Sequence, residues 1–182
     1  MVGGVIAPVI ETTAQVLGNR RLRLLRDLSA QALECRTDDE ACDTVARILA
    51  ANAADVPFSL LYLMDRDGQH ATLVRSTGFD GGATPAPDIT EIETGPSAGD
   101  GNSNALERLL VRVARRGSAG VLTNLEECGS FPGGPWPEPA RSAVVLPIVS
   151  PGQAALAGLL VAGASPRREL DDEYRGFFDL LA

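Results

Sequence analysis

The stretch Phe58-Ser59-Leu60-Leu61-Tyr62-Leu63-Met64 decides the fold. It is rich in β-forming residues and almost continuously apolar, as a central strand covered on both faces would be. The four residues that follow, Asp65-Arg66-Asp67-Gly68, predict a turn, because Gly68 suits a positive φ. Residues 69–77 are then the return strand, with Ala71, Leu73 and Arg75 on one face. The pattern predicts an antiparallel hairpin inside a sheet.

A second hairpin is predicted near the other end of the chain. Residues 142–149 and 155–164 are apolar strands separated by Ser150-Pro151-Gly152-Gln153. Shorter strands are expected at 88–93 and at Val121-Leu122. Because consecutive strands are joined as hairpins, the sheet is expected to be antiparallel.

Helices are predicted before, between and after the strands. Thr37 and Glu40 form a capping box that opens a helix over 37–53. Asn104 opens a helix through about Arg116, and Asp171 opens the last one. This last helix carries an apolar face at helical spacing, made of Tyr174, Phe177, Phe178 and Leu181. With helices before and after an antiparallel sheet, the fold class is α+β.

The N-terminal region has two predicted parts. Residues 1–11 read as an isolated strand, which we interpret as the tail of a preceding domain. Residues 12–35 read as a long helix, with leucines at 17, 24, 25 and 28 on one face and Arg20, Arg21, Arg23 and Arg26 on the rest. Two interpretations remain open: a helix packed on the core with a solvated arginine face, or one whose first half forms a parallel coiled coil.

The amino-acid composition limits which classes of protein this chain can belong to. The chain has 182 residues, of which 45% are hydrophobic and 22% charged, as in one ordinary globular domain. Its net charge of −8 disfavours nucleic acid and anionic membranes as partners. All 16 basic residues are arginine, so mechanisms that need a lysine amine are excluded. No apolar run is long enough to span a bilayer, and three cysteines with no close pair indicate a reducing cytoplasm.

The order of these elements over residues 22–182 resembles a GAF domain, the small-molecule sensory module of signalling proteins. The resemblance rests on the capped helix 37–53, the strand 58–64 with its turn, the strands 143–148 and 157–163, and the closing segment 168–182. The segment 132–139 resembles GAF domains of bacterial hybrid sensor histidine kinases. Residues 1–28 resemble the end of a PAS domain that continues through a signalling helix.

The resemblance implies a central antiparallel sheet of five or six strands, with helices on one face and a loop-covered pocket on the other. It divides the chain into residues 1–18, the tail of a preceding domain with its linker helix, and 19–182, a sensory domain. It implies a homodimer through the terminal helices and a kinase core in the same parent chain. We expect a cytoplasmic protein with no catalytic residues in this chain.

The resemblance also suggests which residues surround the pocket. Strand alternation and the family's architecture together place six residues around it: Tyr62, Met64, Leu73, Arg75, Leu110 and Trp136. An unknown small molecule is the expected ligand, and no cofactor or metal is predicted. The family's cyclic-nucleotide signature contains a lysine that this chain lacks, and no histidine adjoins Cys128 as a bilin site requires.

One enzymatic interpretation remains open. Some proteins with this fold reduce free methionine sulfoxide through cysteines on pocket loops. Cys128 lies on a predicted pocket loop, whereas Cys35 and Cys42 are expected on the other side of the sheet. The Gly95–Gly99 match to a serine-hydrolase motif is a coincidence, because it lies in a polar loop instead of between a strand and a helix. Two non-enzymatic interpretations also stay open: a GAF domain of a different signalling effector, and a ligand-free dimerisation module.

Overall fold

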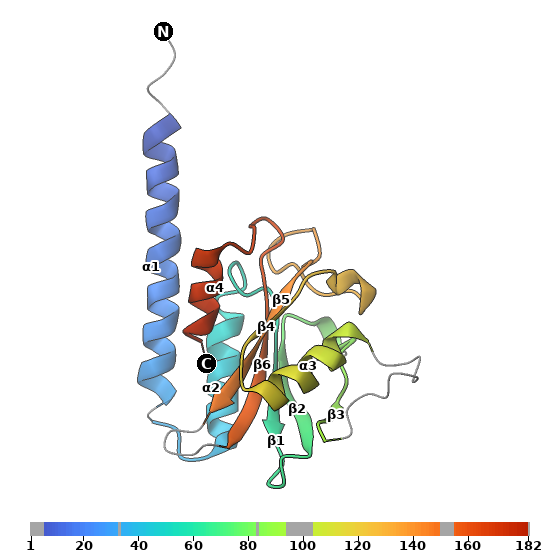
Figure 1. Cartoon of the computed structure of the whole chain (residues 1–182). Coiled ribbons are helices and arrows are strands. Elements are labelled where there is room, and N and C mark those ends of the chain that lie inside the picture. Colours follow the sequence, from blue (N-terminus) through green and yellow to red (C-terminus); the bar gives the residue numbers. More distant parts are fainter. Residues whose placement is uncertain (1–5, 33, 83, 94–103, 150–154, 182) are drawn as a thin grey trace.

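The structure, a computed structural model, describes residues 6–32, 34–82, 84–93, 104–149 and 155–181. Four α-helices and six strands form a single layered unit (Figure 1). The elements are α1 (Ile6–Ala32), α2 (Asp38–Ala50), β1 (Ser59–Met64), β2 (His70–Thr77), β3 (Ile89–Glu91), α3 (Ala105–Arg116), β4 (Gly120–Leu122), β5 (Ala143–Val149), β6 (Leu156–Gly163) and α4 (Asp172–Asp179). The strands predicted after residue 57 and the three later helices are confirmed, with ends shifted by a few residues.

The strands form one sheet in the order β3-β2-β1-β6-β5-β4, and every neighbouring pair is antiparallel. β1 and β6 lie at the centre, which explains their almost continuous apolar character. The α+β class with a six-stranded antiparallel sheet is therefore confirmed.

The sheet separates two hydrophobic cores. On one face, Leu24 of α1, Leu49 of α2 and Phe178 of α4 pack with alternate strand residues such as Leu61. On the other face, α3 packs through Leu110 on Tyr62 and its neighbours. Strand alternation sends Leu60 and Tyr62 to the α3 face and Leu61 to the opposite face. Helices α1, α2 and α4 thus share one side, as predicted.

Helix starts follow the predicted caps. The Thr37 hydroxyl accepts a hydrogen bond from the Glu40 amide at 3.2 Å. Asn104 and Asp171 cap α3 and α4 in the same way. The Glu40 carboxylate, however, accepts from the Arg36 amide instead of the Thr37 amide, so only half of the capping box is formed.

The N-terminal prediction needs correction. α1 begins at Ile6, so the strand expected over 1–11 is wrong for residues 6–11, and residues 1–5 lie outside the described residues. Pro8 is tolerated because it lies in the first turn, where a missing backbone N–H breaks no intrahelical bond. α1 continues through residue 18, and its N-terminal half projects past the rest of the fold (Figure 1). No helix among the described residues is both long enough and apolar enough to cross a membrane.

Candidate functional site

Four of the nominated pocket residues lie together on the α3 face. Tyr62 and Leu110 are completely buried in its core, while Met64 and Leu73 pack against it and are half-buried. The Tyr62 hydroxyl donates a hydrogen bond to the Pro87 carbonyl at 2.9 Å. Burial raises the pKa of Tyr62, so this hydroxyl stays neutral and acts as a donor. The structure thus gathers these four side chains beneath α3.

Arg75 lies on the opposite face, so its predicted placement beside Leu73 is wrong. Tyr62 pairs with Leu73 but Leu61 pairs with Arg75, which leaves Val74 as an extra residue in β2. Such a bulge resets the alternation of side chains. Arg75 consequently donates to Asp39 at 2.6 Å and to Asp43, both on α2. It ties β2 to α2.

Trp136 is also placed elsewhere. It lies in the loop formed by residues 131–140, called here the 131–140 loop, with its ring 4.5 Å from the Arg167 guanidinium. Arg167 pairs with Glu138 of the same loop at 3.1 Å. Among the described residues, Trp136 does not belong to the core that contains Tyr62. Phe131 does, and its ring lies 4.9 Å from that of Phe58.

The 131–140 loop packs closely on the segment 51–57 that joins α2 to β1. Gly134 has a φ of +69°, and a β-carbon there would collide with the Ala53 carbonyl oxygen. A glycine is therefore required at this position on two grounds, left-handed backbone and close approach. Phe58, the residue that follows the segment, is completely buried against Phe131. The loop beside the α3 face is thereby in contact with the segment that contains Asp55.

We expect Gly134→Ala to lower the free energy of unfolding by about 1–3 kcal/mol, the combined cost of a strained φ and a backbone collision. Gly176→Ala is the matched control, because Gly176 lies inside α4 with open space around it. That control should raise stability by about 0.5–1 kcal/mol, since alanine favours a helix over glycine. Urea unfolding followed by circular dichroism measures both. Equal effects of the two substitutions would contradict the close approach at Gly134.

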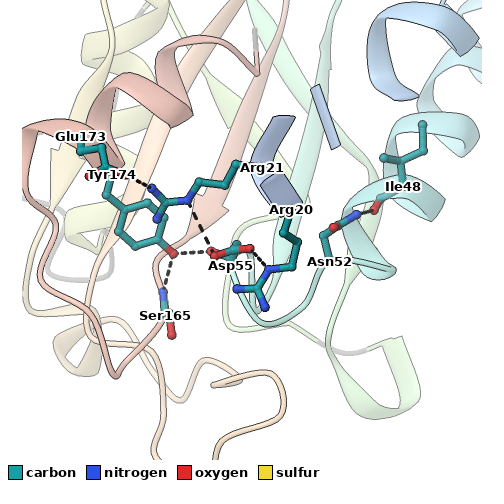
Figure 2. Close-up of polar contacts among 8 residues, drawn as sticks. All are labelled: Arg20, Arg21, Ile48, Asn52, Asp55, Ser165, Glu173 and Tyr174. Atoms are coloured by element: carbon teal, nitrogen blue, oxygen red, sulfur yellow. Dashed lines mark hydrogen bonds and ion pairs between the residues drawn. The ribbon is translucent and has the colours of Figure 1, made fainter. Parts of the chain in front are cut away.

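Asp55 is the centre of a buried polar cluster (Figure 2). Its carboxylate is 1% exposed and forms a short hydrogen-bonded ion pair with Arg20 of α1. The second carboxylate oxygen lies 3.8 Å from Nε of Arg21, also on α1. We call Arg20, Arg21, Asp55, Ser165 and Tyr174 the Asp55 junction. It joins α1, the segment 51–57, the end of β6 and α4.

Arg21 is 5% exposed, so its predicted place on a solvated arginine face is wrong. Its guanidinium stacks 4.3 Å from the ring centre of Tyr174 and 5.0 Å from that of Phe177, and it donates to Glu173 at 3.4 Å. Desolvation lowers the pKa of Arg21, and the nearby charge of Arg168 lowers it further. The hydrogen bond to Asp55 instead raises the pKa of Arg20. Both arginines stay charged.

Tyr174 connects α4 to the same cluster. Its hydroxyl donates a short hydrogen bond to the Asp55 carbonyl and accepts from the Ser165 amide at 3.0 Å. Burial raises the pKa of Tyr174 to about 12. The hydroxyl therefore remains protonated and holds two backbone segments together. Any displacement of α1 relative to α4 must break or rearrange contacts in this junction.

Sequence reasoning missed this junction. The sequence pattern marks Asp55 only as the end of a helix, and its partners Arg20 and Arg21 lie far earlier in the chain. A signal existed: Asp55 is the only charged residue within Ala53-Ala54-Asp55-Val56-Pro57-Phe58. A lone acid in an apolar run is rarely buried unless it is paired.

The cysteines do not form a common site. Cys128 packs on the α3-face core, whereas Cys42 is buried in the core of the other face. Cys35 donates to the Gln31 carbonyl at the end of α1. Among the described residues, no group of three or more His, Cys, Asp or Glu side chains is placed to hold a metal ion.

No protein-family model matches the chain, and no curated protein matches it. Solved structures do match. The GAF domain of an Acinetobacter phosphoenolpyruvate-protein phosphotransferase is 18% identical, with 90% of this chain and 88% of that chain covered and a TM-score of 0.59. A putative GAF sensor protein from Burkholderia vietnamiensis is 14% identical, with coverages of 90% and 83% and a TM-score of 0.61. The enzyme fRMsr of Staphylococcus aureus, in complex with substrate, is 13% identical, with coverages of 88% and 90% and a TM-score of 0.59.

Proposed function

We propose that this chain, which has the GAF fold, is a sensory domain that binds a small molecule on its α3 face and passes the signal to α1 and α4. The observation that carries the proposal is the Asp55 junction. Both outgoing helices meet there, and the segment 51–57 that supplies Asp55 also contacts the 131–140 loop beside the α3 face. A ligand that repositions this loop would bias the packing of α1 through a continuous set of contacts.

The finer assignment is that the chain belongs to a cytoplasmic sensor histidine kinase and dimerises through its terminal helices. Its support is the long, projecting α1 and three exposed apolar side chains, two on α1 and one directly after α4: Val16, Leu22 and Leu180 are 57%, 64% and 68% exposed. Such side chains gain burial when a second helix packs on them. The boundary at residues 18 and 19 remains a prediction, since α1 is continuous across it.

Native mass spectrometry of the purified protein tests ligand binding. We expect a small molecule to remain bound to the wild type and to be lost from Leu73→Trp, which adds bulk at the edge of the α3-face core. Thr72→Trp is the matched control, because the neighbouring Thr72 is exposed and does not belong to that core. A molecule that persists in Leu73→Trp would contradict the assigned face.

A second candidate function is reduction of free methionine sulfoxide, favoured by the likeness to fRMsr and by Cys128 on the α3 face. Against it, neither Cys35 nor Cys42 belongs to the core on which Cys128 packs. We expect no reductase activity with thioredoxin or dithiothreitol as reductant. Activity in the wild type that disappears in Cys128→Ser but survives in Cys42→Ser would replace the sensory proposal.

A further inference from the structure

A groove of about 580 Å³ opens at the end of the sheet where β4 ends and β5 begins. Arg141 and Ser142 line it beside β5, and the segment 168–171 and Arg175 line it from the side of α4. A second hollow of about 540 Å³ adjoins it and shares Glu126 and Arg141 with it. The groove differs from the proposed ligand face, because none of its lining residues belongs to the core beneath α3.

Three arginines and three carboxylates line the groove, so its basic side chains can offer donors to an anion only where they are not already paired. Arg141, Arg168 and Arg175 all line it, and none of them makes an ion pair with a carboxylate of the described residues. Nη1 of Arg168 is moreover buried without a hydrogen-bond acceptor among the described residues. Buried donors are normally satisfied, and an unsatisfied charged donor is costly. This nitrogen is therefore a charged donor with unused hydrogen-bonding capacity.

Arg168 also lies beside the Asp55 junction. Arg168 lies 5.3 Å from the ring centre of Tyr174, the same ring on which Arg21 stacks at 4.3 Å. The two guanidinium groups repel each other, and Asp55 already pairs with Arg20. Within the described residues, the only other carboxylate paired with Arg21 is that of Glu173, which is 73% exposed. An anion beside Arg168 would relieve this repulsion.

The lining residues also limit the size of the anion. Glu126, Glu169 and Asp171 line the groove, and Asp171 already accepts the capping hydrogen bond of α4 at 2.8 Å. Carboxylates beside the arginines disfavour an extended polyanion such as nucleic acid. A phosphate group is compact, carries close to two negative charges and offers three acceptor oxygens. Several arginine side chains can therefore each donate paired hydrogen bonds to it.

We propose that this groove binds the phosphate group of a small phosphorylated molecule through Arg141, Arg168 and Arg175, and that the bound phosphate tightens the attachment of α1. The site is separate from the proposed ligand face, so it stands even if that function fails. The phosphate would offset the charge of Arg168 beside Arg21 and so strengthen the contacts of α1 with Tyr174 and Asp55.

Titration with inorganic phosphate at low ionic strength, followed by calorimetry and by thermal unfolding, tests the site. We expect saturable binding of one phosphate and a rise in Tm. Binding should weaken at least tenfold in Arg141→Gln and in Arg168→Gln, and the Tm rise should disappear in both. Arg112→Gln is the control, since Arg112 is an exposed arginine of α3 outside the groove, and it should behave as the wild type.

Two further results make the test decisive. Without phosphate, Arg168→Gln should not lower Tm, because it removes a charge that repels Arg21. If that variant fails to fold, the exposed Arg141 still tests the site. Absence of saturable binding, equal weakening in Arg112→Gln, or acetate binding as tightly as phosphate would each overturn the proposal.

Discussion

Replacing Asp55 with alanine is expected to lower the free energy of unfolding by about 3–5 kcal/mol. The substitution removes the carboxylate that pairs with Arg20 and leaves Arg21, which is 5% exposed, with only the exposed Glu173 as an anionic partner among the described residues. An uncompensated buried charge costs far more than a lost surface ion pair. Urea unfolding at neutral pH measures the change.

Asp43→Ala is the matched control. Asp43 also pairs with an arginine, Arg75, but its side chain is 63% exposed. We expect little change in stability, because exposed ion pairs are screened by water. A double-mutant cycle with Asp55→Ala and Arg21→Met then isolates the coupling of the two charges. A coupling energy near zero would contradict the assigned role of Arg21 as a partner of Asp55.

Phe58→Ala is expected to cost about 3–5 kcal/mol, as is typical when a large buried aromatic is truncated. Phe58 is completely buried, and its ring lies 4.9 Å from Phe131 and 5.6 Å from Phe79. The cavity would open where the segment 51–57 enters β1, beside the 131–140 loop. Thermal and urea unfolding report the loss.

The control for Phe58 is a leucine substitution, which keeps most of the buried volume. Phe58→Leu should cost clearly less than Phe58→Ala, since the penalty grows with the cavity that remains. If both variants were equally destabilised, ring-to-ring contacts and not volume would dominate at this position. If neither variant lost stability, the aromatic cluster of Phe58, Phe79 and Phe131 would not stabilise the fold.

Periodicity and capping patterns predicted most of the fold. The strands, the caps at Thr37, Asn104 and Asp171, and the buried aromatic face of α4 all depend on residues near one another in the chain. The prediction is wrong at residues 6–11 because a short apolar run fits a strand or a helix equally well. Arg75 was misplaced because a bulge, which alternation does not reveal, inverts the face of β2 at Val74.

The candidate site was predicted only in part. Tyr62, Met64, Leu73 and Leu110 do come together, because sheet alternation and one helix face determine their positions. The Asp55 junction did not emerge from the sequence, since its partners come from α1 and α4 and are adjacent only after the helices pack. Arg21 looked like a surface residue because guanidinium groups are usually exposed; stacking on Tyr174 and Phe177 made its burial possible.

Amide hydrogen exchange of Gly134→Ala, compared with the wild type, tests most directly whether the loop beside the α3 face communicates with α1. The atoms nearest to a β-carbon at Gly134 belong to Ala53 and Pro57 of the segment 51–57, and none of these three atoms belongs to α1. If the segment carries the coupling, exchange in α1 over residues 16–28 should accelerate several-fold along with exchange in the 131–140 loop, whereas the stabilising Gly176→Ala should not accelerate exchange in α1. Acceleration confined to the 131–140 loop, with α1 as protected as in the wild type, would contradict the relay.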